Sequence, residues 1–158
     1  MEKINIREMK ADDYPGVRAV DELTQRQYLG SQWDHLTRTE KDVHLQSRQS
    51  EFELNLQTGY CFVAVMNETV IGFVLAHETL PFRDMVYIRY VAIHPDYQGG
   101  GIGSLLYQVA IDKARQNGIE KISALINLDN SKSIKLHEKL GFELIDRKEA
   151  ILSLRGEG

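Results

Sequence analysis

The chain contains little cysteine and little proline, with one Cys and three Pro among 158 residues. A lone cysteine cannot form an internal disulfide, so Cys61 is typical of a protein in a reducing cytoplasm. Phe62 and further apolar residues follow it, which favours a packed strand thiol over a nucleophile. No apolar run approaches the roughly 18–20 residues that span a bilayer, and residues 1–7 contain no apolar secretion segment. These absences predict a cytoplasmic protein that does not enter membranes.

Basic residues do not cluster in this sequence. The net charge is −4, and no group of Lys and Arg forms a stripe that would attract nucleic acid. The five His show no spacing with Cys or carboxylates that would form a metal site. An acidic surface suits a cationic substrate such as an amine without requiring one. We therefore expect neither nucleic acid nor a metal as a partner.

Hydrophobic periodicity predicts a mixed sheet with helices on both faces. The hydrophobic fraction is 42% and the charged fraction 27%, which is ordinary for one domain over residues 1–158. Residues 28–35 read as a loop whose aromatic side chains either line a pocket or pack in the core. We expect strands at 3–9, 60–66, 70–78, 85–93, 122–127, 142–147 and 149–154, and helices starting at Asp12 or Asp13 and spanning 39–56, 102–117 and 131–140.

The most informative stretch runs from Tyr87 to Gly103. Strand-forming residues end at His94, a glycine-rich turn follows, and an apolar-periodic helix opens at Ile102. Glycine has no Cβ, so the amides of the turn can converge on one point. The helix adds its first unpaired N–H groups and the positive end of its dipole. Such a device suits a phosphate or a pyrophosphate.

Two familiar phosphate motifs do not fit this turn. A P-loop needs Lys after a glycine, and no glycine here is followed by one. A dinucleotide fingerprint that starts at Gly99 or Gly101 needs glycine at its sixth position, where Ser104 or Leu106 stands. What remains is the run Gln98–Gly103. Taken alone, it is equally compatible with a turn whose glycines serve a purely steric purpose.

A second motif follows about 30 residues later, over Asn130–Phe142. Ile134 and Leu136 supply apolar positions for a short packed helix. Gly141 is predicted to end this helix, and Phe142 to begin a strand.

The two motifs together resemble the signatures of the acetyl-CoA-dependent N-acetyltransferases of the GNAT superfamily. These signatures are Q/R-x-x-G-x-G/A and an Asn before a short helix ending in L-Y-E-K-x-G-F; the resemblance covers residues 87–142. It implies the GNAT acyl-CoA N-acyltransferase fold, an α/β (α+β) domain with a mixed, mostly antiparallel sheet of six to seven strands. It also implies acetyl-CoA as co-substrate, an amine acceptor and no metal.

The resemblance also implies where the coenzyme binds. In the family, the strand ending here at Ile93 and the following strand start paired and then splay, and the pantetheine arm enters between them. Relatives often carry a cation at the position of Gly100, so that phosphate contact is in doubt. Asn130 either contacts the coenzyme or caps the following helix, or does both. The residues implied in coenzyme binding are Val91, Ala92, Ile93, Gln98, Gly99, Gly100, Gly101, Ile102, Gly103, Ser104 and Asn130.

His137 departs from the family, which usually has Tyr at this position as the general acid for the leaving thiolate. A thiol with a pKa of about 8.5 leaves readily as the thiolate. An imidazole N–H that donates a hydrogen bond to the sulfur could therefore suffice. The alternative is a surface histidine without a catalytic role. We expect His137 to donate to the sulfur.

The general base is less determined. Relatives often place Glu near the position of Arg89, and Arg cannot accept a proton. Glu78 is our candidate for the general base, and His77 and Asp84 could replace it. The alternative for each is a solvated residue at the end of a strand. Arg89 could instead bind an anionic substrate group such as a carboxylate.

The resulting expectation is an acyltransferase that acetylates a primary amine of a small molecule or peptide by direct attack in a ternary complex. Two alternatives stay open: a protein N-terminal or lysine acetyltransferase, and a catalytically weak module that only binds CoA. By analogy with the family, a homodimer through the C-terminal strands is also expected.

Overall fold

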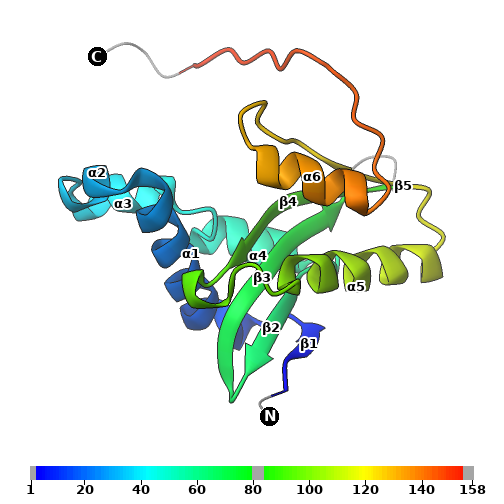
Figure 1. Cartoon of the computed structure of the whole chain (residues 1–158), viewed down its shortest axis with the longest axis horizontal. Helices are drawn as coiled ribbons and strands as arrows, with labels where there is room; N and C mark the ends of the chain where they lie inside the picture. Colours follow the sequence, from blue (N-terminus) through cyan, green and yellow to red (C-terminus); the bar gives the residue numbers. More distant parts are fainter. Residues whose placement is uncertain (1–2, 80–83, 155–158) are drawn as a thin grey trace. The chain divides into compact units, whose positions relative to one another are not determined.

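The structure, a computed structural model, describes residues 3–79 and 84–154 (Figure 1). These residues form two compact units, one ending at Leu125 and the other beginning at Ile126.

A five-stranded sheet in the order β1-β2-β3-β4-β5 forms the centre of the larger unit. All neighbouring strands are antiparallel except β4 and β5, which run parallel. The predicted mixed, mostly antiparallel sheet is confirmed, whereas the predicted six to seven strands are wrong: five are present in the described residues. The strands are β1 Asn5–Glu8, β2 Phe62–Met66, β3 Thr69–Glu78, β4 Met85–Ile93 and β5 Lys121–Ala124.

Helices cover both faces of this sheet. Because side chains alternate along a strand, Val63 lies in a core cluster with Val17 of α1 and Phe52 of α4. Phe62, one residue earlier, lies on the α5 side, under the ammonium group of Lys113. Figure 1 shows α5 on one side of the strands and α1 and α4 on the other. The helices are α1 Tyr14–Leu29, α4 Gln49–Leu56 and α5 Ile102–Gln116, with short 3-10 turns η1 Ala11–Asp13 and η2 Pro95–Tyr97.

Cys61 belongs to the same core cluster and is 1% exposed. Its Sγ lies 3.3 Å from the carbonyl oxygen of Asn55, and burial raises the pKa of the thiol to about 11. The expectation of a packed thiol rather than a nucleophile is confirmed, although Cys61 stands one residue before β2 rather than in it.

The predicted continuous helix over residues 39–56 is wrong. The chain forms α3 at Arg38–His44 and α4 at Gln49–Leu56, with an extended residue, Leu45, after α3. The break lets Leu45 become buried. It also lets Ser47 donate its N–H and its hydroxyl to the carboxylate of Asp21, both at 2.7 Å. Tertiary contacts therefore override the helical pattern.

The predicted loop over residues 28–35 is also wrong. Helix α1 continues to Leu29, Gly30 reverses the chain with a φ of +60°, and α2 follows at Ser31–Asp34. Trp33 in α2 is buried and its ring lies under the ammonium of Lys41 at 5.3 Å. Tyr28 is exposed. Of the two explanations offered for these aromatics, core packing holds for Trp33.

Asp13 stands directly before α1, as predicted, but its carboxylate does not cap that helix. It accepts two bonds of 2.8 Å from the guanidinium of Arg7 and one of 2.8 Å from the N–H of Lys10. The bond to Arg7 is the main cause that lowers the pKa of Asp13, with burial acting against it.

The smaller unit holds α6, Ser131–Lys139, followed by residues without regular structure (Figure 1). The predicted strands 142–147 and 149–154 are not formed. A hairpin of these two strands would have Lys148 as its entire loop, whereas the shortest common hairpin loops have two residues. The strand predicted at 122–127 ends at Ala124.

Candidate functional site

The two strands at the centre of the predicted site are paired over only part of their length. β5 pairs with β4 from Met85 to Ile88, and no further. β3 pairs with β4 as far as Ile93. The edge of β4 beyond Ile88 therefore has no β5 neighbour in the described residues. This is the partial pairing that the resemblance predicted.

The backbone direction shows which residues of β4 face this free edge. His94 donates its N–H to Ile71 of β3 at 2.8 Å. Because successive residues of a strand point their polar groups to opposite edges, Ala92 also faces β3, while Val91 and Ile93 face away from it. The side chain of Ala92 lies in the core cluster. Of the three residues predicted from this strand, Val91 and Ile93 thus present main-chain groups to the free edge.

The glycine-rich turn joins this edge to α5. Gly99 and Gly101 have φ values of +83° and +82°, a region that side chains other than glycine rarely adopt. Apart from the two adjoining residues, no heavy atom of the described part of the chain lies within 4 Å of the position a Cβ would take at either glycine. The turn therefore requires glycine for its backbone and leaves open space beside it.

Helix α5 begins at the end of this turn. The first helical hydrogen bond of α5 runs from the N–H of Leu105 to the carbonyl oxygen of Gly101, at 3.1 Å. The N–H groups of Ile102, Gly103 and Ser104 belong to the first turn, where an α-helix offers no acceptor. The buried side chain of Ile102 packs near Gly72 of β3 and fixes the helix start against the sheet.

Gln98 fixes the other end of the turn. Its Nε2 donates to the carbonyl of Ile93 at 3.0 Å and to Oε1 of Gln27 at 2.9 Å. The side chain of Gln98 thus acts on the conformation of the turn and links it to α1. It also uses the Ile93 carbonyl, which leaves the Ile93 N–H for a ligand on the free edge.

Arg89 lies at an irregularity of β4. Leu75 pairs with Tyr90 and the next residue of β3 pairs with Ile88, so Arg89 is the extra residue of a β-bulge. Its Nη2 lies 3.4 Å from Oε2 of Glu51 on α4. Its Nε is buried and makes no hydrogen bond in the described part of the chain. The guanidinium is therefore only partly satisfied.

Tyr90, the residue of β4 that follows Arg89, belongs to a buried polar cluster. The hydroxyl of Tyr90 accepts a bond of 3.1 Å from Nε2 of Gln25, and burial raises the pKa of Tyr90. On the same helix α1, Asp21 is fully buried and accepts both bonds from Ser47. Burial is the largest effect on Asp21 and raises its pKa, against the hydrogen bonds from Ser47. Sequence reasoning missed Glu51 and this cluster, since the residues come from α1, α4, β4 and a helix break.

Glu78, the predicted base, ends β3 opposite Val86 and is half-buried. Gly72, the β3 partner of Ile93, lies six residues earlier on that strand, a separation of roughly 20 Å. His77 stacks on Tyr87, with ring centroids 5.7 Å apart. A proton from the Ile93 end would therefore reach Glu78 only through water.

In the smaller unit, Asn130 caps α6. Its side-chain oxygen accepts a bond of 3.1 Å from the N–H of Ser133, which confirms the capping role. His137, four residues after Ser133, is 3% exposed and packs edge-on against Phe142 with ring centroids 5.0 Å apart. It is not the surface histidine of the alternative explanation.

The tautomer of His137 follows from its bond within α6. Nδ1 lies 2.7 Å from the carbonyl oxygen of Ser133. A carbonyl can only accept, so Nδ1 carries a hydrogen. In the neutral ring Nε2 then has a lone pair, and only the imidazolium carries a second N–H. The predicted donation to a sulfur therefore requires the protonated ring.

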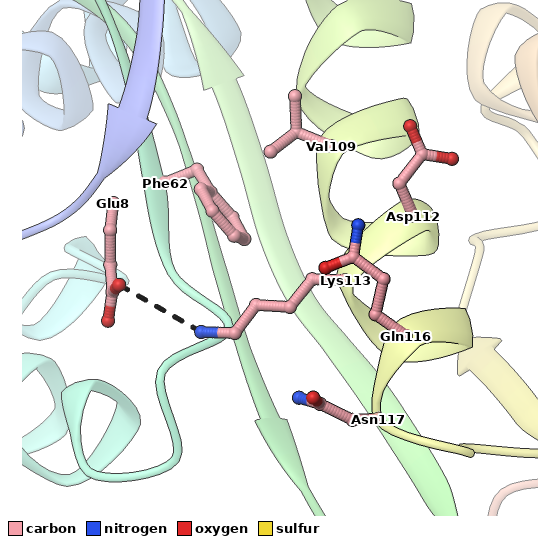
Figure 2. A pocket seen from close by; sticks show the side chains of 7 residues that line it. All are labelled: Glu8, Phe62, Val109, Asp112, Lys113, Gln116 and Asn117. Atoms are coloured by element: carbon pink, nitrogen blue, oxygen red, sulfur yellow. Dashed lines mark ion pairs between the residues drawn. The ribbon is translucent and has the colours of Figure 1, made fainter.

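A separate hollow of about 330 Å³ lies near the C-terminal end of α5 (Figure 2). Lys113 lies 3.9 Å from Glu8 there and also bonds to the carbonyl of Gly59. Lys113 comes eleven residues after Ile102, about 17 Å along the helix. The hollow is thus not the site at the glycine turn. Figure 2 shows its lining side chains: Glu8, Phe62, Val109, Asp112, Lys113, Gln116 and Asn117.

In residues 3–79 and 84–154, no group of three His, Cys, Asp or Glu side chains is placed to hold a metal ion. None of the helices described there is both long enough and apolar enough to cross a membrane.

Comparisons with known proteins agree with this geometry. The chain is 29% identical over 146 residues to an L-methionine sulfoximine/L-methionine sulfone acetyltransferase of Pseudomonas paraeruginosa, covering 89% of this chain and 80% of that protein. It is 31% identical over 118 residues to an L-amino acid N-acyltransferase of Escherichia coli, covering 73% and 66%. Its fold matches the PaiA N-acetyltransferase of Thermoplasma acidophilum, solved in complex with coenzyme A, with a TM-score of 0.76 at 16% identity, covering 92% and 93%. The model of the acetyltransferase (GNAT) family matches residues 17–142. The chain belongs to the acetyltransferase (GNAT) family.

Proposed function

We propose that the chain transfers the acetyl group of acetyl-CoA to the primary amine of a small molecule that also carries a carboxylate, as an α-amino acid does. The free edge of β4, running into the glycine turn, carries the coenzyme half of this proposal. Arg89 carries the acceptor half, supported by relatives whose names state activity on methionine sulfoximine and on L-amino acids.

The residues of the turn fit a diphosphate. Gly99 and Gly101 hold the backbone in the left-handed region with open space beside them. The first N–H groups of α5, at Ile102, Gly103 and Ser104, add donors at the positive end of the helix dipole. Main-chain groups of Val91 and Ile93 would hold the pantetheine arm as an added strand.

Acetyl-CoA supplies the acyl group as an activated thioester. An N–H of β4 near Ile93 donates to the carbonyl oxygen as the amine attacks, so that charge on this oxygen is stabilised. The C–N bond forms and the C–S bond breaks. The amine gives up its proton to water, with Glu78 as the predicted acceptor at the end of the relay. His137 is the predicted donor to the leaving sulfur. Positioning of the two substrates contributes much of the rate.

Arg89 would bind the carboxylate of the acceptor. Its Nη2 is held by Glu51 at 3.4 Å, which is longer than a typical charge-assisted hydrogen bond. Its Nε makes no bond in the described residues. A substrate carboxylate would accept from the part of the guanidinium that is exposed, since the Arg89 side chain is 28% exposed, and planar guanidinium groups favour such pairs. The bulge places this group on the strand that also offers Val91 and Ile93.

A thiol-release assay with acetyl-CoA tests the proposal. The informative pair is L-methionine sulfone and 3-(methylsulfonyl)propylamine, which differ only by the carboxylate. We expect kcat/KM at least about tenfold higher for the amino acid, the difference that one hydrogen-bonded charge pair makes. Equal rates would contradict the carboxylate site, and release with peptides alone would favour the protein acetyltransferase. Coenzyme A binding without turnover of any amine would favour the binding module.

Three expectations from the sequence stay predictions. They are the cytoplasmic location, the absence of a nucleic-acid partner, and the homodimer.

A further inference from the structure

Gln27, an exposed residue of α1, forms a reciprocal pair with Gln98 at the start of the glycine turn. The Nε2 of Gln98 donates to Oε1 of Gln27 at 2.9 Å, and the Nε2 of Gln27 donates to Oε1 of Gln98 at 3.2 Å. The two residues are 71 positions apart in the sequence. Exposed glutamines ordinarily bond to water and keep their rotamer freedom. A two-bond pair between two distant, exposed amides therefore indicates a role other than core packing.

The bond from Gln98 to Ile93 determines how both side-chain amides are oriented. The Nε2 of Gln98 also donates to the carbonyl oxygen of Ile93, at 3.0 Å. A carbonyl can only accept, so turning the amide of Gln98 around would set its oxygen against the oxygen of Ile93. Gln27 must then present its oxygen to Nε2 of Gln98 and its N–H to Oε1. The three residues thus form one network with a defined donor and acceptor at each contact.

This network joins the two parts of the proposed coenzyme site. Ile93 ends β4, and Gln98 directly precedes Gly99 of the turn. Between them the chain forms η2, which is closed by a bond of 2.9 Å from the N–H of Tyr97 to the carbonyl of His94. The bond from Gln98 to Ile93 therefore ties the start of the turn to the end of the free edge.

Helix α1 holds Gln27 in place through a second contact with β4. Two residues before Gln27, the buried side chain of Gln25 donates to the hydroxyl of Tyr90 at 3.1 Å. Tyr90 lies on β4, and Gln98 lies at the turn that follows this strand. The end of α1 thus bonds to the strand and to the turn at once, which fixes the turn relative to the edge of β4.

We propose that Gln27 is a positioning residue for the coenzyme. Through Gln98 it sets the spacing between the free edge of β4 and the glycine turn, so that the arm and the diphosphate of coenzyme A bind together. This inference rests on the proposed coenzyme site. A ligand that occupies two linked sites binds more tightly than either part alone only when the geometry of the sites lets both engage. Loss of the pair should therefore weaken coenzyme A, which spans both sites, and leave pantetheine, which occupies the edge alone, unaffected.

NMR titrations of the full chain with coenzyme A and with pantetheine test this role, because they give two dissociation constants for each variant. Gln27→Met keeps the length and the helix propensity of the side chain but removes both bonds to Gln98. The dissociation constant of coenzyme A should rise about three- to fivefold, and that of pantetheine should stay at the wild-type value. In the acetyl-transfer assay the same variant should raise KM for acetyl-CoA and leave kcat unchanged.

Gln108→Met is the matched control. Gln108 is an exposed glutamine of α5 whose Nε2 also makes a bond of 2.9 Å, to Oδ1 of Asp112. Its replacement should change neither dissociation constant.

A double-mutant cycle tests whether Gln27 acts through Gln98. Gln98→Met removes the pair and the bond to Ile93, so it should weaken coenzyme A more than Gln27→Met does. Once Gln98 is replaced, Gln27→Met should add no further loss, because the two residues act as one unit. Losses that add up independently would contradict the proposed route.

The titrations separate failure of this inference from failure of the coenzyme site. If Gln27→Met binds coenzyme A as tightly as the wild type does, the positioning role is wrong and the site stands. Equal weakening of coenzyme A and pantetheine would show a general effect on the strand edge and would also overturn the proposal. A wild type that binds coenzyme A no more tightly than pantetheine would contradict the diphosphate site itself, and this inference with it.

Discussion

The Arg89 bulge lies within β4, whereas the glycine turn follows this strand, and the two rely on different parts of the chain. The turn presents main-chain N–H groups and depends on backbone angles at Gly99 and Gly101. The bulge presents a side chain whose position depends on Glu51 of another element. A main-chain site is sensitive to changes that alter φ and tolerant of most others. A side-chain site is sensitive to the identity of one residue and its neighbours.

The largest expected effect comes from Gly101→Val. A β-branched residue at a φ of +82° is strained, so the turn must shift and its amides no longer converge. We expect kcat/KM for acetyl-CoA to fall on the order of 10²-fold, as displacements of about 1 Å do. Gly118→Val is the matched control, because Gly118 has a φ of +74° beyond the other end of α5. It should lose similar stability in thermal unfolding and keep the KM for acetyl-CoA; an equal loss of activity in both variants would contradict the assignment.

Arg89→Gln tests the side-chain site. The variant keeps hydrogen-bonding atoms but loses the charge, so kcat/KM for L-methionine sulfone should fall about 10–100-fold. The rate with 3-(methylsulfonyl)propylamine should change little. Arg48→Gln removes the other arginine near Glu51, at 3.8 Å, and should leave both rates close to wild type. Equal losses with both substrates would show that Arg89 does not read the carboxylate.

A smaller effect is expected at His137. His137→Phe can keep the edge-on packing with Phe142 but removes the hydrogen-bond donor. Because a thiolate leaves readily without protonation, kcat should fall only about tenfold. His137→Tyr restores a donor and should recover part of the loss. Solvent isotope effects on kcat should differ between wild type and His137→Phe. If His137→Phe leaves kcat unchanged, the histidine has only a structural role.

The smallest expected effect is on the free energy of unfolding, through the buried carboxyl of Asp21 on α1. Burial raises the pKa of Asp21 above its usual value near 3.8, so its stabilising contribution is complete below that value and is lost as pH rises through the folded pKa. The advantage of wild type over Asp21→Asn in chemical unfolding should therefore shrink with rising pH in that window. Asp13, whose pKa Arg7 lowers, should give the opposite sign: the advantage over Asp13→Asn should be present at neutral pH and fall in acid. An Asp21 curve parallel to that of its variant would contradict the shift.

The turn could be predicted from the sequence because its information is local. Glycines, the preceding strand and the following helix lie within Tyr87–Gly103, and their φ requirements and orphan amides follow from residue type. The structure places Gly99, Gly101 and the start of α5 as that reasoning expects.

The surroundings of Arg89 could not be predicted, because the residues that form them come from segments far apart in the sequence. Glu51 meets Arg89 only after α4 has packed on the sheet, and the break between α3 and α4 depends on the bond of Ser47 to Asp21. A helical pattern over residues 39–56 carries no sign of that bond. The strands predicted at 142–147 and 149–154 are absent for another reason: as a hairpin they would be joined by Lys148 alone, which is shorter than a common hairpin loop.

The central claim is that the amides from Gly99 to Ser104 bind the diphosphate of coenzyme A while the free edge of β4 binds the pantetheine arm. Amide NMR of the ¹⁵N-labelled chain, titrated with coenzyme A and separately with pantetheine, tests both parts at once. We predict that Val91 and Ile93 shift with both ligands and that Gly99–Ser104 shift only with coenzyme A. Turn amides that stay unchanged while coenzyme A saturates the protein would contradict the account.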